Sequence, residues 1–154
     1  MDHIDRKIVA ELENDGRMSF AALSERVGVS KSPAWQRVRA LEEAGVIRGF
    51  HAEVSPSALG LVVECLVDVQ IRLDAHIAFE DAVLAHPAVI ECRTTAGDSD
   101  YVLRIFARSM EHLDDLLRHD LSKLPGVHRL STKIFLKTIK SRSSLTKWAV
   151  ASAH

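Results

Sequence analysis

The order of periodic segments in the second half of the chain is the strongest constraint on the fold. Runs with strand character and runs with helical spacing follow one another as strand, helix, strand, strand, helix, strand. This order predicts an α+β domain with the ferredoxin-like split motif, in which both helices cover one face of an antiparallel sheet. The predicted strands cover residues 64–74, 89–95, 101–107 and 127–139.

The first predicted strand indicates which face of this sheet is buried. Val67, Ile71 and Leu73 lie in an apolar row that alternates with polar side chains, so this row is expected to face the helices. Leu66 interrupts the opposite, mostly polar row. Because the helices cover one side only, the other face must meet solvent or a partner, and the mixed row favours burial in a homodimer.

The first 49 residues contain three short helical segments. A capping side chain precedes each segment and a glycine follows it. The caps are Asp2, Ser19 and either Ser30 or Ser32, and the glycines are Gly16, Gly28 and Gly45. This arrangement is typical of a helix-turn-helix. An alternating run with Phe50, Ala52 and Val54 on one side then predicts a short strand that ends at Ser55-Pro56.

The third helical segment has one apolar and one polar face. At about 100° per residue, Ala34, Val38 and Leu41 fall on one side, which predicts the buried face. The opposite side and its flanks carry Lys31, Ser32, Trp35, Gln36, Arg37 and Arg39. Arginine can pair with guanine, glutamine with adenine, and serine or lysine with phosphates, so this helix fits the major groove of DNA. A solvated helix face, with Trp35 packed on the preceding helix, is the simpler interpretation.

The turn Ala96-Gly97-Asp98-Ser99-Asp100-Tyr101 carries two carboxylates and a glycine. Aspartate and glycine are the residues that tight turns require, so a purely structural turn is one interpretation. The other is that exposed backbone groups and an aspartate hold the ammonium and carboxylate groups of a small zwitterion. Both interpretations stay open from the residues alone.

Composition and charge exclude several classes of protein. The chain of 154 residues has 20 basic and 21 acidic side chains, too balanced to coat nucleic acid by charge alone. No apolar run approaches the roughly 20 residues that cross a bilayer. The amino terminus has no apolar signal segment, which predicts a cytoplasmic protein. Residues 133–154 carry basic and no acidic side chains, a tail that either helps to hold DNA or is a solvated end.

The sequence lacks the common motifs of catalytic and metal sites. It has no glycine-rich phosphate loop, no His-Glu-x-x-His motif, no paired cysteine motif and no serine elbow. Cys65 and Cys92 are isolated, which suits a reducing compartment, and Cys92 is expected to lie in the core. His112 and His119 share a helix face without a third ligand, so we expect them to be solvated. We therefore predict no metal, no cofactor and no enzymatic activity.

Several short fragments, each weak alone, are specific in their order and spacing. They are residues 4–8, 15–17, 23–30, 37–42 and 45–50, then Gly97-Asp98-Ser99-Asp100-Tyr101 and Leu124-Pro125-Gly126-Val127. In this combination the chain resembles the Lrp/AsnC, or feast/famine, family of prokaryotic transcriptional regulators. The resemblance covers nearly the whole chain, from residue 4 to about residue 139.

The resemblance implies a winged helix-turn-helix domain joined to a ligand-sensing domain of ferredoxin-like fold. It implies double-stranded DNA and an amino-acid effector as partners, together with homodimers that often assemble into octamers. The predicted boundaries are 1–55 for the DNA-binding domain with its linker strand, 56–60 for a hinge, 61–140 for effector binding and oligomerisation, and 141–154 for the basic tail.

Carried over by position, the resemblance also implies two sets of site residues. The implied DNA contacts are Ser30, Lys31, Ser32, Trp35, Gln36, Arg37 and Arg39, and the implied effector contacts are Ala96, Gly97, Asp98, Asp100 and Thr132. The chain departs from the family at Ala34-Trp35, where Cys-Leu is common, and at Leu130, where Thr is frequent. These departures bear on the preferred DNA sequence and on the identity of the effector.

Two functions of other classes stay open from the sequence. The same pair of folds resembles that of siroheme decarboxylases, tetrapyrrole enzymes whose front domain no longer binds DNA. Against this, the exposed face of the third helix keeps Lys, Gln and Arg. The second is a stand-alone amino-acid-binding module that acts on an enzyme partner. The first alternative predicts affinity for tetrapyrroles, and the second predicts effector binding without DNA affinity.

Overall fold

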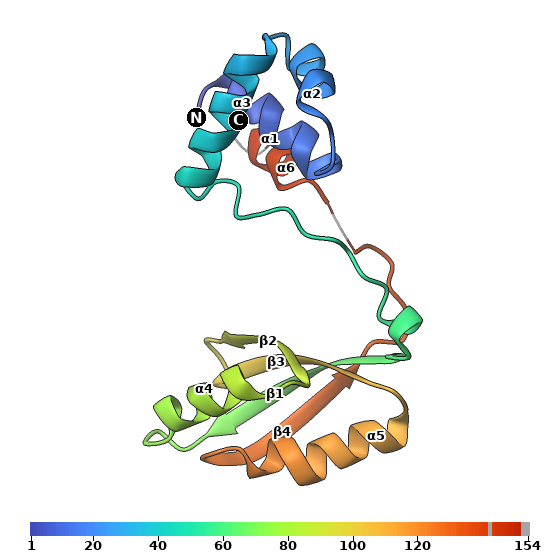
Figure 1. The fold of residues 1–154 in the computed structure, drawn as a ribbon. Helices are drawn as coiled ribbons and strands as arrows, with labels where there is room; N and C mark the ends of the chain where they lie inside the picture. Colours follow the sequence, from blue (N-terminus) through green and yellow to red (C-terminus); the bar gives the residue numbers. More distant parts are fainter. Residues whose placement is uncertain (142, 152–154) are drawn as a thin grey trace. The chain divides into compact units, whose positions relative to one another are not determined.

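The computed structural model describes residues 1–141 and 143–151 of the chain, so residues 142 and 152–154 of the predicted basic tail lie outside it. The chain divides into two compact units. The head unit combines Met1–Glu53 with the segment that begins at Lys140, and the sheet unit is Val54–Ile139. Figure 1 shows the helices of the head unit and the strands and helices of the sheet unit.

The head unit is built on three helices, α1 (His3–Asn14), α2 (Phe20–Val27) and α3 (Lys31–Glu43). The predicted caps of the first two helices are confirmed. The Asp2 carboxylate accepts from the Asp5 N–H at 2.8 Å, and the Asp5 carboxylate accepts from the Asp2 N–H at 2.8 Å, which forms a capping box. The Ser19 hydroxyl caps α2, and Gly28 ends it in the left-handed conformation.

One apolar cluster holds the three helices together. Ile8 and Leu23 are completely buried in it, and Val38 and Leu41 of α3 are nearly so. Ala34, Val38 and Leu41 are the buried residues of α3, as its periodicity predicts. The buried stripe leaves the opposite side of α3 exposed.

Arg37 fixes α3 to the first turn of α1. Its Nη1 lies 2.7 Å from Asp2 Oδ2 and 2.6 Å from Asp5 Oδ1. The backbone N–H of Asp5 and the Arg37 guanidinium lower the pKa of Asp2 from 3.8 to about 2. The capping box and the contact between α1 and α3 thus share the same two carboxylates.

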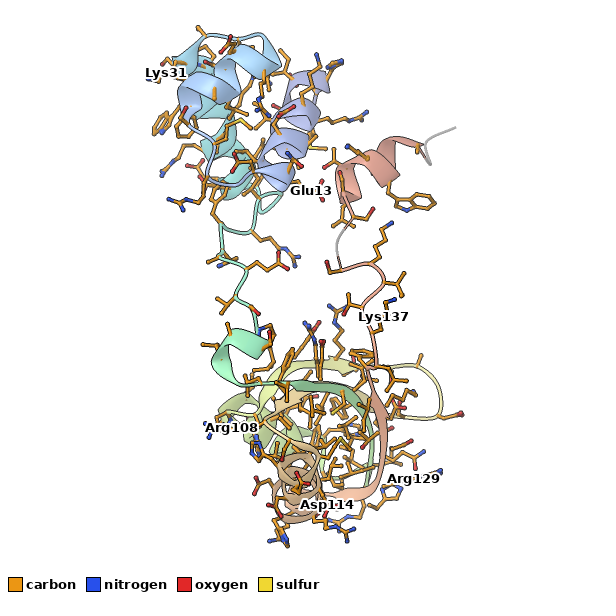
Figure 2. All side chains as sticks on the ribbon, turned by 90° about the vertical axis from the view of Figure 1, so that its right-hand side faces the viewer. Glu13, Lys31, Arg108, Asp114, Arg129 and Lys137 are labelled. Carbon is orange, nitrogen blue, oxygen red and sulfur yellow. The ribbon has the colours of Figure 1, made fainter. Side chains whose placement is uncertain are left out.

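A further helix, α6 (Leu145–Ala151), belongs to the head unit and contacts α1. Glu13 of α1 accepts hydrogen bonds at the start of α6 from Ser144 Oγ at 2.7 Å and Leu145 N at 2.6 Å, and more weakly from Thr146 N at 3.3 Å. Burial opposes ionisation of Glu13, but these hydrogen bonds outweigh it and lower its pKa. Figure 2 shows Glu13 on the side of α1 that faces this segment. Neither predicted role of the tail, holding DNA or being a solvated end, includes this helix, because a cap supplied from over a hundred residues away leaves no local signal in the sequence.

The predicted strand at residues 50–54 is not formed. A strand requires a hydrogen-bonded neighbour, and none of the described segments pairs with this run through its backbone. The Phe50 side chain instead packs toward α1, where a Cβ added to Gly16 would come within 3.3 Å of Phe50 Cδ1. The alternating apolar pattern of residues 50–54 therefore does not correspond to a strand in this structure.

The sheet unit has the predicted split motif. A short turn of 3-10 helix, η1 (Ser57–Leu59), precedes the first strand. The elements are β1 (Val63–Ile71), α4 (His76–Ala85), β2 (Val89–Thr94), β3 (Tyr101–Ala107), α5 (Met110–Asp115) with its continuation as the π-helical turn η2 (Leu116–Asp120) and the 3-10 turn η3 (Leu121–Lys123), and β4 (Val127–Ile134). The strands lie in the order β2-β3-β1-β4, and all neighbours are antiparallel. Figure 1 shows α4 and α5 packed along this sheet.

Both helices of the motif cover the same face of the sheet. Val67 and Val69 of β1 are completely buried in one cluster with Leu103 of β3, Phe79 of α4 and Leu113 at the start of the second helix. The side chains between them, on the other face, are only half-buried. Within residues 54–139, which the structure describes in full, no element covers the other side of the sheet, as predicted.

The strand ends differ from the prediction at two places. Leu73 is 88% exposed rather than buried, because β1 stops at Ile71 and the Arg72 N–H turns to the carbonyl of Gly126. The last strand ends at Ile134 rather than at residue 139, because its regular pairing with β1 stops where Ile134 lies opposite Cys65, and only the Phe135 N–H donates further, to the Glu64 carbonyl at 2.9 Å. Strand length is thus set by the neighbouring strand, which the local pattern does not contain.

Gly126 is required where the chain enters β4. Its φ is +74°, and an added Cβ would overlap the Cβ of Ala75. We expect Gly126→Ala to destabilise the protein by about 3 kcal/mol, from left-handed strain and overpacking together. Gly60→Ala is the control, because Gly60 has the same φ of +74° but no atom within 4 Å of the added Cβ. Urea unfolding of both variants checks this, and equal losses of stability would contradict the overlap.

The Asp2 carboxylate makes the stability of the head unit sensitive to acid. Its folded pKa of about 2 lies below the ordinary 3.8, so its stabilising contribution is present above pH 3.8 and is lost as the pH falls towards 2. Arg37→Gln removes part of this shift, and the variant should lose less stability than the native protein over that pH range. Arg48→Gln removes the same charge from an exposed residue as a control. Thermal unfolding at several pH values checks the difference, and parallel curves for native protein and Arg37→Gln would contradict it.

Candidate DNA-binding and effector-binding sites

Most of the residues that are predicted to contact DNA lie on the exposed face of α3. Ser30 is the N-cap of α3 and its hydroxyl makes no capping bond, while Lys31 projects from the first residue of the helix (Figure 2). The exposed residues of this face are Ser30, Lys31, Ser32, Trp35, Gln36 and Arg39. The free N–H groups of a helix N-terminus favour an anion, so the start of α3 suits a phosphate.

Arg39 is held between two side chains of its own helix. Its guanidinium carbon lies 5.7 Å from the ring centroid of Trp35, over the ring. On the other side, Nη2 lies 3.7 Å from Glu43 Oε1. The spacing of four residues between each pair places all three side chains along one stripe of the helix.

Trp35 lies on the surface of α3 beside a hollow. It is 50% exposed, yet it also lines a pocket of about 330 Å³ together with Met18, Phe20 and Phe50. The ring thus borders a hollow of the head unit and keeps half of its surface exposed. Arg37 differs, since it is half-buried and engaged with Asp2 and Asp5, so it holds α3 in place instead of joining the exposed set.

The turn between β2 and β3 is fixed by Asp100. The Asp100 carboxylate accepts from the Ile71 N–H at 2.9 Å, and its own N–H donates to the Val69 carbonyl at 3.0 Å. The Thr95 hydroxyl donates to the Ser99 carbonyl at 2.5 Å. Gly97 has a φ of +148°, which favours glycine. Asp100 therefore ties the turn to the end of β1.

A small polar pocket lies beside this turn on the open face of the sheet. Its volume is about 360 Å³, and its lining residues are Asp68, Gln70, Asp98, Ser99, Arg129 and Ser131. Gln70 donates to the Asp98 carbonyl, and Asp68 is paired with Lys133 at 2.5 Å. Within the described part of the chain, the side chains of Asp98 and Arg129 form no ion pair. The pocket thus presents a carboxylate and a guanidinium, the two charges that complement a zwitterion; Figure 2 shows Arg129 on the outside of the sheet unit.

The predicted effector residues are only partly brought together. Asp98 lines the pocket, and Ala96 and Gly97 are exposed in the same turn. Thr132 lies opposite Val67 in the register of β1 and β4, so it is on the helix-covered face and away from the pocket. The neighbouring residue Ser131 lines the pocket where Thr132 was expected.

The structure adds pocket residues that the sequence analysis did not select. Asp68 and Gln70 come from β1, while Arg129 and Ser131 come from β4. They pair directly across the sheet, Asp68 with Ser131 and Gln70 with Arg129. Their signal was the polar outward row of the first predicted strand, but the pairing of that row with β4 requires the register.

Other reactive side chains do not gather into a second site. Burial raises the pKa of the Cys65 thiol to about 11 and also raises that of Cys92. The predicted core position of Cys92 agrees with its packing against the main cluster. Among the residues that the structure describes, no three His, Cys, Asp or Glu side chains are placed to share a metal ion. No helix in residues 1–141 and 143–151 is long and apolar enough to cross a membrane.

Similar proteins of known sequence cover almost the whole chain. The chain is 38% identical over 143 residues to the leucine-responsive regulatory protein of Rhizobium meliloti, covering 91% of this chain and 92% of that protein. It is 36% identical over 148 residues to the leucine-responsive regulatory protein of Escherichia coli K12, covering 94% of this chain and 90% of that protein.

Solved structures share the arrangement of elements. A transcriptional regulator from Neisseria meningitidis, solved as a complex with L-Met, has a TM-score of 0.90 at 34% identity and covers 94% of this chain and 96% of that chain. An AsnC family transcriptional regulator from Agrobacterium tumefaciens has a TM-score of 0.85 at 29% identity, with 94% and 96% coverage.

Family models match both units of the chain. Residues 1–48 match the model described as winged helix-turn-helix DNA-binding, which covers α1 to α3. Residues 64–145 match the model of the Lrp/AsnC ligand binding domain, which covers the split motif and the polar pocket. With its helix-turn-helix head and its antiparallel sheet unit, this chain belongs to the Lrp/AsnC family of transcriptional regulators.

Proposed function

We propose that this regulator binds a specific DNA sequence through the exposed face of α3, and that an amino acid bound at the polar pocket of the sheet unit changes this binding. The observation that carries the proposal is the division of α3. A buried apolar stripe fixes the helix, and the opposite face presents two hydroxyls, a lysine, an amide and an arginine. These are the groups that read base edges and phosphates in the major groove.

Within this proposal, the residues of α3 have different tasks. Ser30 and Lys31 bind phosphate at the start of the helix, where backbone N–H groups also favour an anion. Gln36 and Arg39 face base edges, with Arg39 suited to a guanine and Gln36 to an adenine. Arg37 holds α3 on α1, so we leave it out of the DNA contacts.

An amino acid is the class of effector that fits the polar pocket. Asp98 can bind an ammonium group and Arg129 a carboxylate, while the lining serines and Gln70 supply further polar contacts. The related Neisseria meningitidis regulator was solved with L-Met, which supports the same class of ligand for this chain. The exposed backbone of Ala96 and Gly97 lies in the same turn and extends this contact surface.

Assembly connects the two sites in this proposal. The open face of the sheet is half-buried and mixed in character, which suits a homodimer that presents two copies of α3 to a two-fold related DNA site. Further association, to an octamer, then sets the spacing of the heads. The effector changes DNA binding only by its different affinity for these assemblies. The protein acts on chromosomal DNA in the cytoplasm and needs no catalytic step.

Fluorescence anisotropy on DNA from upstream of this protein's own gene tests the whole proposal. The titration is run at two salt concentrations, with competitor DNA, and with and without a pool of the twenty amino acids. We expect sequence-preferring binding that shifts with the pool. Binding that vanishes under competitor DNA would contradict the DNA-binding part, and binding that ignores the pool would contradict the effector part.

Arg39→Ala is expected to weaken specific DNA binding by about 1–3 kcal/mol, because it removes a two-bond contact to one base. Lys31→Ala serves as the comparison, since a lost phosphate contact weakens binding to all sequences alike. Anisotropy with specific and scrambled duplexes separates the two effects. An Arg39→Ala protein that keeps its preference for the specific duplex would contradict the role of Arg39.

Asp98→Asn is expected to abolish the response to the effector while DNA affinity stays unchanged. Couplings of this kind commonly change affinity by roughly 5- to 150-fold, and the ratio should fall to near one in the variant. Asp81→Asn, at an exposed position on α4, is the control for loss of one negative charge. A full effector response in Asp98→Asn would place the effector elsewhere.

A further inference from the structure

The side chains of Trp35, Arg39 and Glu43 form a continuous stripe along the exposed side of α3. The Arg39 guanidinium stacks over the Trp35 ring at 5.7 Å and faces the Glu43 carboxylate at 3.7 Å. Both contacts come from the same helix, so they exist before any DNA is bound. Arg39 is therefore restrained on two sides while its remaining N–H groups stay exposed.

We propose that Trp35 is a positioning residue for base reading: together with Glu43 it fixes the Arg39 guanidinium as a preformed fork, and it thereby sets how strongly the regulator prefers a guanine. This inference rests on the proposed binding of DNA by α3. It assigns Trp35 an action through Arg39, in place of the direct contact with DNA that the sequence resemblance implied.

The Trp35 ring offers Arg39 a broad aromatic face on the same side of α3. The ring borders a hollow that Met18, Phe20 and Phe50 also line, and the Arg39 side chain borders the same hollow. A free arginine loses considerable rotamer entropy when it docks on a base, and a restrained one loses less. The restraint therefore strengthens a two-bond contact to guanine, which demands one orientation of the guanidinium, more than it strengthens contacts of loose geometry.

No other side chain of α3, a helix that the structure describes in full, is restrained by two contacts within the helix itself. Arg37, the second arginine of the helix, is engaged with Asp2 and Asp5 of α1. Gln36 is exposed, and no contact within the described residues restrains its side chain. The restraint is specific to Arg39, so its loss should affect one base pair of the site and leave the others unchanged.

A guanine analogue that lacks one acceptor measures this effect directly. A duplex is first selected from a random library with the full-length native protein. Each guanine is then replaced in turn by 7-deazaguanine, which has no N7 acceptor. The guanine that Arg39 reads is the one whose replacement weakens binding of the native protein but not of Arg39→Ala. The discrimination ratio is the affinity for guanine divided by that for 7-deazaguanine at this position.

Comparison of Trp35→Leu with Trp35→Phe then distinguishes the effect of the aromatic face from the effect of side-chain volume. Leucine keeps an apolar side chain beside the hollow but offers no aromatic face to a cation, whereas phenylalanine keeps a weaker one. We expect Trp35→Leu to lower the discrimination ratio about two- to fivefold, with Trp35→Phe in between. Affinity for the 7-deazaguanine duplex should stay unchanged in both variants, since that duplex does not use the restrained contact.

Glu43→Gln provides a second arm of the test that leaves the Trp35 side chain unchanged. Its side chain is 71% exposed, so the variant is expected to fold normally and still lose one end of the restraint. Glu42→Gln is the matched control, because it removes the same charge one residue away. We expect Glu43→Gln to lower the discrimination ratio and Glu42→Gln to leave it unchanged.

The possible outcomes are distinct. If Trp35→Leu weakens both duplexes equally, Trp35 contacts DNA itself or only supports the fold, and the positioning role is wrong. If Arg39→Ala remains sensitive to every analogue, Arg39 reads no guanine and the inference falls while DNA binding stands. If the native protein selects no sequence at all, the proposed function fails first and this inference fails with it.

Discussion

The register of β1 between its two neighbours decides which side chains the sheet buries and which it offers for binding. Side chains alternate between faces along a strand, so a shift by one residue would exchange the two rows completely. In the observed register Val67 faces the helices, and Thr132 beside it on β4 shares that face. Asp68 and Ser131 consequently share the open face and line the polar pocket. The core and the pocket are two consequences of one pairing.

In the head unit, one buried stripe of a helix likewise decides which side chains are exposed. The stripe of Ala34, Val38 and Leu41 fixes the rotation of α3, and that rotation alone decides that Trp35 and Arg39 are exposed. Surface ion pairs contribute little energy when solvent screens them, so the Arg37 cluster matters mainly for geometry. It fastens the first turn of α1 to α3 at the edge of the apolar cluster, to which Ile4 of the same turn also packs.

Sequence reasoning succeeded where the information was local. The caps at Asp2 and Ser19, the buried stripe of α3 and the order of the split motif all follow from spacing within short segments. It failed where contacts with a distant segment of the chain determine the structure. The pairing of β4 with β1, which stops at Ile134, and the Glu13 cap of α6 both involve residues far apart in the chain. The polar pocket required the pairing of β1 with β4, so the turn around Asp98 was found but its neighbours across the sheet were not.

In both sites, one of two like residues makes contacts within the protein and the other is exposed, which a motif alone does not reveal. In the turn, Asp100 accepts from the Ile71 N–H and holds the backbone, which leaves Asp98 to face the pocket. In α3, Arg37 holds α1, which leaves Arg39 on the exposed stripe. Each pair has the same residue type two positions apart, and in each pair one member binds inside the protein while the other stays available for binding. Replacing the structural member should therefore disturb both folding and binding, whereas replacing the exposed member should disturb binding alone, so stability measured beside affinity tells the two roles apart.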